Sequence, residues 1–201
     1  KNNADWIILQ PLLKKNLSSK ECFDFYKHLI PFTGETLVGI QNAREYLGVG
    51  LTTKQILDLY NSFSNFRVIK GEAPSVFIEK EIKYYPKDLR VFNGRGGQEI
   101  VDNFLLGCKG IVPAFDLADK FLTIYNNIKK DNIENANKEY QKILPFIVFI
   151  MQSIETLTCY GKRVCAYRMG ISKVYDRSPS LIPTNYGIKK SKEIAKNLGL
   201  F

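Results

Sequence analysis

Lys70 has the residue type and position that are most suggestive of covalent chemistry in this sequence. It follows the strand-like run Phe66–Ile69 and precedes Gly71 and Glu72. An amine at the end of a buried strand is partly removed from water, so it loses its proton more readily than an exposed amine. A neutral amine can attack a ketone and form an iminium, which then accepts electrons. The alternative is a lysine whose ammonium simply reaches solvent, and the spacing alone favours that alternative.

Polar or small residues also follow the other apolar segments. They are Gln10-Pro11, Gln41-Asn42, Asn93–Gly97 and Val112-Pro113. The backbone N–H groups of Asn93–Gly97 could bind a carboxylate or phosphate, but the segment lacks a nucleotide-binding pattern, and a plain tight turn explains it equally well. Glu72 and Asp116 could act as acid and base. Asp116, however, precedes a helical pattern and is more simply a helix N-cap.

Composition argues against metal catalysis and against a disulfide scaffold. The chain has a single histidine, His28, and four cysteines without a CxxC pair. Zinc sites need several closely spaced cysteine or histidine ligands, and disulfide frameworks occur in oxidising compartments. We therefore expect no metal, no cofactor and a cytoplasmic location.

The net charge of +9 raises the possibility of a nucleic-acid partner. The lysines are scattered, however, and form no basic stripe with interleaved aromatic residues, so we expect no nucleic acid to bind. The most apolar run, Ile143–Met151, contains Pro145 and is shorter than the roughly 20 residues that a membrane-spanning helix needs. We therefore expect no membrane partner.

Apolar segments alternate with amphipathic ones along the first half of the chain. The predicted strands are Trp6–Leu9, Leu37–Ile40, Phe66–Ile69, Leu89–Phe92 and Gly110–Ala114. Their continuous apolar character is typical of parallel strands covered on both faces. The patterns Ser18-x-x-Glu21 and Thr52-x-x-Gln55 are capping boxes that predict helix starts between strands. This alternation indicates a βα-barrel or a doubly wound sheet.

From Asp116 onward the periodicity predicts helices throughout, with Pro145 kinking or dividing one of them. We expect the barrel part to occupy residues 1–130 and a helical extension to occupy residues 131–201. Five strands cannot close an eight-stranded barrel, so a complete barrel would need roughly 80 to 100 residues before Lys1. An open five-stranded sheet is the alternative that needs none.

Four short segments together resemble the dihydrodipicolinate synthase and N-acetylneuraminate lyase family. They are Ile40-Gln41-Asn42, Ile69-Lys70-Gly71-Glu72-Ala73, Phe92-Asn93-Gly94 and Gly107–Val112. The resemblance implies an α/β fold, a (β/α)8 TIM barrel of which this chain holds strands 4 to 8, followed by a C-terminal helical extension. It also implies that Lys70 forms a Schiff base with a 2-oxo acid, and that the protein is a homotetramer.

The resemblance further implies a set of residues around Lys70. Gln41 takes the place of the family's proton-relaying tyrosine, and a carboxamide cannot replace a phenol in proton transfer. Tyr46 takes the place of the arginine that lysine-pathway members use for a substrate carboxylate, with Arg44 nearby. By the same correspondence, we expect Asn42, Tyr46, Asn93, Gly94 and Val112 to contact substrate.

The Gln41-Asn42 pair resembles branches of the family that act on 2-keto-3-deoxy sugar acids, as dehydratases or aldolases. The leading prediction is therefore a Schiff-base lyase acting on such an acid. Dihydrodipicolinate synthesis from pyruvate and aspartate semialdehyde is the nearest alternative. A catalytically silent scaffold and a basic nucleic-acid-binding domain are the others.

Overall fold

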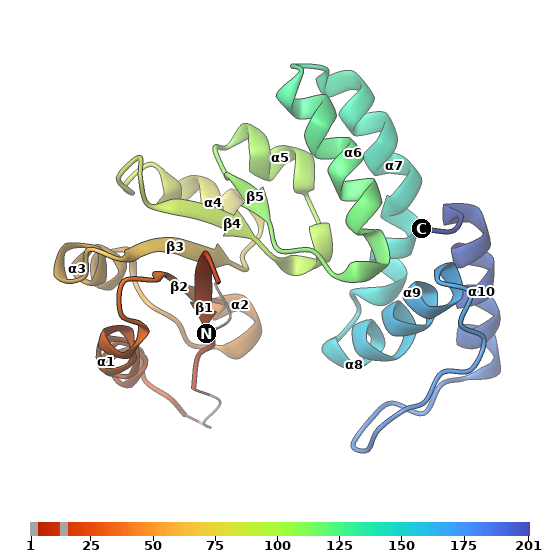
Figure 1. Cartoon of the computed structure of the whole chain (residues 1–201), viewed down its shortest axis with the longest axis horizontal. Coiled ribbons are helices and arrows are strands. Elements are labelled where there is room, and N and C mark those ends of the chain that lie inside the picture. Colours follow the sequence, from red (N-terminus) through yellow and green to blue (C-terminus); the bar gives the residue numbers. More distant parts are fainter. Residues whose placement is uncertain (1–3, 13–15) are drawn as a thin grey trace. The chain divides into compact units, whose positions relative to one another are not determined.

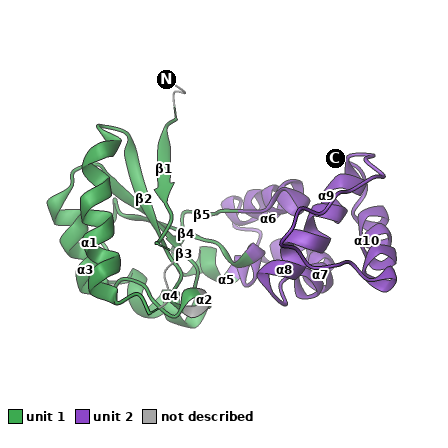
Figure 2. Cartoon of the chain, turned by 90° about the horizontal axis from the view of Figure 1, so that it is seen from below, with its two compact units in different colours: residues 1–95, 102–112 green, residues 96–101, 113–201 purple. Residues whose placement is uncertain are grey.

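The structure is a computed structural model that describes residues 4–12 and 16–201, apart from the side chains of residues 45 and 46. The chain divides into two compact units, coloured separately in Figure 2. The first unit consists of Lys1–Arg95 and Asp102–Val112, and the second of Gly96–Val101 and Pro113–Phe201. The boundary expected after residue 130 stays a prediction.

The first unit is built on a parallel sheet of five strands in sequential order (Figure 1). The strands are β1 (Trp6–Leu9), β2 (Leu37–Asn42), β3 (Phe66–Gly71), β4 (Arg90–Asn93) and β5 (Gly110–Ile111). A doubly wound sheet reverses its strand order, whereas a barrel adds each strand beside the last. The observed order is therefore that of consecutive barrel strands.

All five predicted strands are present, and β5 is shorter than expected. It ends at Ile111, whereas the apolar run continues to Ala114. Pro113 has no N–H group and cannot donate a hydrogen bond to a sheet ladder, which explains the early end.

Helices connect the strands of the first unit. They are α1 (Ser19–Leu29), the 3-10 turn η1 (Ile30–Thr33), α2 (Arg44–Leu47), α3 (Thr53–Ser62) and α4 (Ser75–Ile82), followed by η2 (Arg95–Gly97) and α5 (Ile100–Leu105), where the chain passes between the units. Both predicted capping boxes are confirmed: Ser18 caps α1 with Glu21, and Thr52 caps α3 with Gln55. The helix α4 had no counterpart in the sequence-based prediction.

One face of the sheet packs on these helices. Val38, Ile40, Ile69 and Val91 belong to a single buried cluster with Tyr26 of α1 and with residues of α3 and α4. Side chains alternate along a strand, so Gln41, Lys70 and Phe92 lie on the opposite face. The helix layer thus fixes which strand residues face away from it.

The second unit is helical. Its elements are η3 (Phe115–Leu117), α6 (Ala118–Lys129), α7 (Ile133–Ile150), α8 (Ile154–Thr156), the π-helix η4 (Leu157–Gly161), α9 (Lys162–Arg168) and α10 (Asn185–Leu198). Helices α6 and α7 lie side by side in Figure 1. The core of this unit includes Phe121 and Ile124 of α6 and Ile143 and Ile147 of α7.

Three expectations for this half of the chain are wrong. Residues 169–184 form no helix, because Pro179 and Pro183 cannot donate the backbone hydrogen bonds that a helix needs. Pro145 does not divide helix α7, which continues to Ile150 with Phe146 and Ile147 buried directly after the proline, and a kink there stays a prediction. Asp116 lies inside η3 and does not cap α6, whose N-cap residue is Leu117.

Within the described residues no single helix is long and apolar enough to cross a membrane, although Ile133–Ile150 and Ile154–Arg168, bent by 109°, meet the length and composition criteria as a pair.

Candidate functional site

Lys70 lies near the C-terminal end of β3, in the middle of the sheet. Strand pairing places Gln41 of β2 on one side of it and Phe92 of β4 on the other. Residues paired in register on parallel strands point to the same face of a sheet. The three side chains therefore form one row on the face that the helices leave uncovered.

Glu72, two residues after Lys70, joins this row. Its Oε1 lies 3.2 Å from Lys70 Nζ, and its Oε2 accepts a hydrogen bond from Gln41 Nε2. The side chains of Lys70 and Glu72 are 17% and 14% exposed, so the ion pair is largely withdrawn from water. Such a pair is screened less by salt than a surface pair. An amine and a carboxylate are thus held in contact at the end of the strand.

Gly94 makes room for this carboxylate. A Cβ atom at position 94 would overlap Glu72 Oε1 and would lie 2.7 Å from Glu72 Cγ. The Gly94 N–H donates to Gly71 O at 3.2 Å. A side chain at this position would therefore displace Glu72 from Lys70.

The carboxamide of Gln41 is oriented by Glu72, and its oxygen accepts no hydrogen bond from the described residues. Its Nε2 must face Glu72, since a carboxylate can only accept hydrogen bonds. Its backbone oxygen accepts a hydrogen bond of 2.9 Å from Tyr26 of α1. Its Oε1 is buried and has no donor among the described residues. A buried oxygen without a donor is costly, and a bound ligand with a hydroxyl group would relieve that cost.

The side chains of Asn42 and Asn93 bond to the protein itself. Asn42 is bound by both its amide atoms to the backbone of Leu51, at 3.2 Å through Nδ2 and 2.9 Å through Oδ1. Asn93 donates through Nδ2 to Ala73 O and to Asn103 Oδ1, each at 3.2 Å. These contacts hold the loops that follow β2 and β3, and the predicted contacts with substrate stay predictions.

The predicted substrate contacts of Val112 and Tyr46 also stay predictions. The Val112 N–H donates to Asn93 O at 2.8 Å, which continues the pairing of β4 and β5. The side chain of Tyr46 lies outside what the structure describes, and its role toward substrate stays a prediction. Arg44, the neighbouring cation, is described and exposed at the start of α2.

An aromatic pair covers the face that carries Lys70. The rings of Trp6 on β1 and Phe92 on β4 stack with their centroids 5.2 Å apart. Phe92 is the neighbour of Lys70 in register. Apolar rings beside the amine keep water from part of this face, which strengthens the electrostatic interactions of the groups there.

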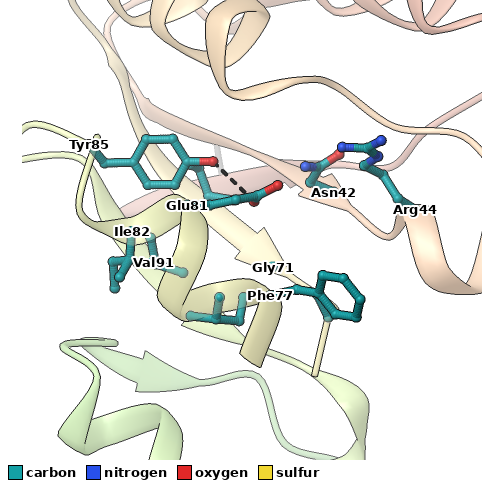
Figure 3. Close-up of a pocket in the computed structure, with 11 residues that line it drawn as sticks. Asn42, Arg44, Gly71, Phe77, Glu81, Ile82, Tyr85 and Val91 are labelled. Carbon is teal, nitrogen blue, oxygen red and sulfur yellow. Dashed lines mark hydrogen bonds between the residues drawn. The ribbon is translucent and has the colours of Figure 1, made fainter. Parts of the chain in front are cut away.

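A cavity of about 140 Å³ lies on the other, helix-bearing side of the sheet (Figure 3). It is lined by Gly71 of β3, Ile78 and Glu81 of α4, and by Tyr85, whose hydroxyl donates to Glu81 Oε2 at 3.3 Å. Burial raises the pKa of Tyr85. The cavity does not include Lys70, so it is separate from the row of Gln41, Lys70 and Glu72.

Glu72 was named from the sequence only as a possible acid or base together with Asp116, and the predicted set of residues around Lys70 left it out. The signal that could have found it is the spacing: positions i and i+2 of a strand point to the same face, so Glu72 follows Lys70 onto one side. Among the described residues there is no cluster of three histidine, cysteine or carboxylate side chains that could hold a metal ion.

Comparison of the sequence with protein-family models and with curated proteins finds no match. Comparison with solved structures finds many. A putative dihydrodipicolinate synthetase from Pseudomonas aeruginosa superposes with a TM-score of 0.85 at 18% identity, covering 98% of this chain and 67% of that one. Dihydrodipicolinate synthase from Rhodopseudomonas palustris gives 0.79 at 16% identity, covering 94% and 65%.

The sialic acid aldolase of Ruminococcus gnavus gives a TM-score of 0.84 at 16% identity, covering 98% of this chain and 65% of that one. A catalytic lysine mutant of that aldolase gives the same values. This chain thus spans about two thirds of the length of these structures, namely five strands of a barrel and the helices that follow. Its structural neighbours are dihydrodipicolinate synthases and a sialic acid aldolase, and it has their fold over that span.

Proposed function

We propose that this protein is a Schiff-base lyase that acts on a 2-oxo acid, with Lys70 as the nucleophile and Glu72 as its acid-base partner. The contact of 3.2 Å between Lys70 Nζ and Glu72 Oε1 carries the proposal. It stands at the C-terminal end of a parallel strand, where barrel enzymes have their active sites. The neighbouring sialic acid aldolase structures include a mutant of a catalytic lysine, which supports the same chemistry here.

Glu72 gives the amine a way to lose and regain protons. An ammonium cannot attack a carbonyl, so Lys70 must first transfer a proton, and Glu72 Oε1 is within reach to accept it. The neutral amine then adds to C2 of the 2-oxo acid, and loss of water gives the iminium. The iminium accepts the electrons of a bond at C3. Loss of the C3 proton with departure of a hydroxyl from C4 is dehydration, and cleavage between C3 and C4 is a retro-aldol reaction.

Gln41 favours a hydroxylated substrate. Its Oε1 is buried without a donor among the described residues, so a substrate hydroxyl would supply the missing hydrogen bond. A 2-keto-3-deoxy sugar acid offers several hydroxyl groups, whereas pyruvate offers none. We therefore prefer such a sugar acid over pyruvate with aspartate semialdehyde. A carboxamide at position 41 also lacks the exchangeable phenolic proton that the lysine-pathway reaction uses in this family.

Borohydride trapping tests the nucleophile. The protein is incubated with sodium borohydride and one of several 2-oxo acids, including pyruvate and 2-keto-3-deoxy sugar acids, and is digested for mass spectrometry. We expect a reduced adduct at Lys70 and at no other lysine. Lys70→Arg retains the positive charge beside Glu72 but forms no stable imine, so it should fold normally and lose the adduct.

The matched control is Lys80→Arg, which changes an exposed lysine of α4 and should leave the adduct intact. An adduct on another lysine, or one that persists in Lys70→Arg, would refute the assignment of the nucleophile. Turnover of pyruvate with aspartate semialdehyde at an ordinary rate would contradict the substrate class and would favour dihydrodipicolinate synthesis.

A further inference from the structure

The second unit contains a cavity of about 410 Å³ between η3, η4 and α9. Its walls include the apolar side chains of Phe115 and Leu157, together with Gly161, Cys165 and the carboxylic residue Asp116. The volume lies in the range of small-molecule sites in proteins. The residues of the row around Lys70 are not part of it.

Asp116 is the unusual member of this wall. Its side chain is 97% buried, since only 3% of the residue is exposed, and its Oδ2 has no hydrogen-bond donor among the described residues. Burial raises the pKa of Asp116 to about 6. Backbone N–H groups of Leu117 and of Asp116 itself bond to this carboxylate, so its unsatisfied acceptor is Oδ2, and a buried acceptor without a donor is unfavourable for the protein alone.

The nearby cations do not neutralise this carboxylate through direct contact. Arg168 directs both of its terminal nitrogens to the carboxylate of Asp119, at 2.9 and 2.7 Å, and bonds only to the backbone oxygen of Asp116. The Lys162 ammonium binds Asp176 Oδ1 at 2.8 Å and Tyr175 O at 2.6 Å. Asp116 is therefore the one charged group lining the cavity that has no ionic partner in the described part of the chain.

Asp116 Oδ2 packs against the backbone of Gly161. A Cβ atom at position 161 would lie 2.9 Å from Asp116 Oδ2, closer than such atoms approach in proteins. Gly161 ends the π-helix η4, and π-helical turns are rare and occur frequently at functional sites. The unsatisfied Oδ2 of Asp116 and the π-helical turn that ends at Gly161 thus meet at one wall.

We propose that this cavity binds a small amphipathic ammonium compound, with Asp116 as its ionic partner and Phe115 and Leu157 as its apolar contacts. Asp116 is one of the residues that line the cavity. The Phe115 ring is 83% exposed without ligand, so an apolar body seated against it would remove that ring from water.

Cys165 offers a probe of occupancy, because it lines the cavity and is the only one of the four cysteines that is not buried. Alkylation of Cys165 by N-ethylmaleimide is followed by mass spectrometry with benzylamine, benzyl alcohol or benzoate present. We expect benzylamine to slow alkylation about tenfold at ten times its dissociation constant. Benzyl alcohol has the same apolar body without the charge, and benzoate has the opposite charge, so neither should protect.

Asp116→Asn should abolish the protection, measured as the ratio of alkylation rates with and without benzylamine, because the Asp116 charge raises the pKa of Cys165 and its loss also speeds alkylation without ligand. Labelling of the buried Cys159, in the same unit, would report unfolding of the variant. A second measurement needs no variant: in the wild-type protein the ratio of rates with and without benzylamine should approach one as the pH falls below 6 and Asp116 is protonated. Equal protection by benzyl alcohol, protection that persists in Asp116→Asn, or none by benzylamine would overturn the proposal.

Discussion

The contact of Lys70 with Glu72 is the basis for the proposed proton transfer between the two side chains. Lys70 Nζ lies 3.2 Å from Glu72 Oε1, and Gln41 holds the second oxygen of that carboxylate. A lysine with only water beside it would need solvent to remove its proton. In the proposed mechanism Glu72 takes over that transfer, and general acid-base groups of this kind contribute typically about 10²- to 10⁴-fold to rate.

Glu72→Gln tests this role at the level of one residue. The glutamine keeps the size of the side chain beside Gly94 but cannot accept a proton. We expect turnover of a 2-keto-3-deoxy sugar acid to fall by about 10²- to 10⁴-fold, with KM changed little and the borohydride adduct at Lys70 still formed on long incubation. Glu79→Gln, at an exposed position of α4, is the control and should leave turnover unchanged. A Glu72→Gln protein as active as wild type would remove Glu72 from the mechanism.

From the raised pKa of Asp116 we predict that the free energy of unfolding depends on pH. Its pKa is raised from 3.8 to about 6 in the folded protein, chiefly by burial, so the folded state binds the proton more tightly than the unfolded state. A raised carboxyl pKa makes the free energy of unfolding decrease as the pH rises through this range. The loss is complete above the folded pKa and amounts to about 3 kcal/mol for a shift of about two units.

Denaturant unfolding of the wild-type protein and of Asp116→Asn measures this effect. The asparagine cannot ionise, so its stability relative to wild type should increase between about pH 4 and pH 6, the unfolded and folded pKa values of Asp116, and stay level above that range. Arg168 and Asp119 are retained in both proteins, so their shared contribution cancels. A stability difference that stays constant with pH would show that Asp116 does not carry the raised pKa.

At the scale of elements, α7 illustrates how packing overrides a local preference. Pro145 lies inside this helix of 18 residues, and its ring removes a hydrogen bond to the carbonyl four residues earlier. Phe146, Ile147 and Ile150 are nevertheless buried in the unit. The burial of such side chains contributes about 1.5 to 3 kcal/mol each, which exceeds the cost of about 3 kcal/mol for one proline.

We therefore expect Pro145→Ala to raise the free energy of unfolding by about 1 to 3 kcal/mol, because alanine restores the missing hydrogen bond. Pro145 is exposed, so little packing is lost with its ring. The comparison is Asn137→Ala on the same helix, also exposed, which changes only helix propensity and should gain about 0.5 kcal/mol. Denaturant titration of the second unit's unfolding gives both values. If Pro145→Ala is no more stable than Asn137→Ala, the hydrogen bond at Gln141 is satisfied in another way.

At the scale of the whole molecule, the expected homotetramer stays a prediction. Leu122 on α6 and Val148 on α7 are 57% and 53% exposed, although both are large apolar side chains. Single exposed apolar residues are normal on protein surfaces, whereas a contiguous patch marks an interface. Substitution of both positions tests whether they belong to one.

Analytical ultracentrifugation tests the assembly. We expect the wild-type protein to sediment as a homo-oligomer at micromolar concentration, and Leu122→Glu with Val148→Glu to lower the sedimentation coefficient, since charges oppose burial at an interface. Glu134→Gln, on an exposed position of α7, should leave it unchanged. A wild-type protein that sediments as a monomer would contradict the expectation of an oligomer.

The sequence by itself determined the strands, the helix starts and the position of Lys70. Continuous apolar runs and capping boxes depend on nearest neighbours along the chain, so β1 to β4 and the starts of α1 and α3 could be predicted directly. The same local rules failed at Pro145 and at Asp116, where contacts distant in the sequence decide the outcome. A prediction from local sequence includes the free-energy cost of a proline in a helix. It does not include the burial of side chains that offsets this cost.

Only the tertiary structure decided what surrounds the reactive residues. The pairing of β2 with β3 brings Gln41 to Glu72, 31 positions apart, and the loops turn the amide of Asn42 to Leu51. The unpaired carboxylate of Asp116 likewise results from Arg168, 52 positions away, being bound to Asp119 instead. Strand register and helix packing determine these contacts between residues that are distant in the sequence. The spacing of residues within one segment encodes neither.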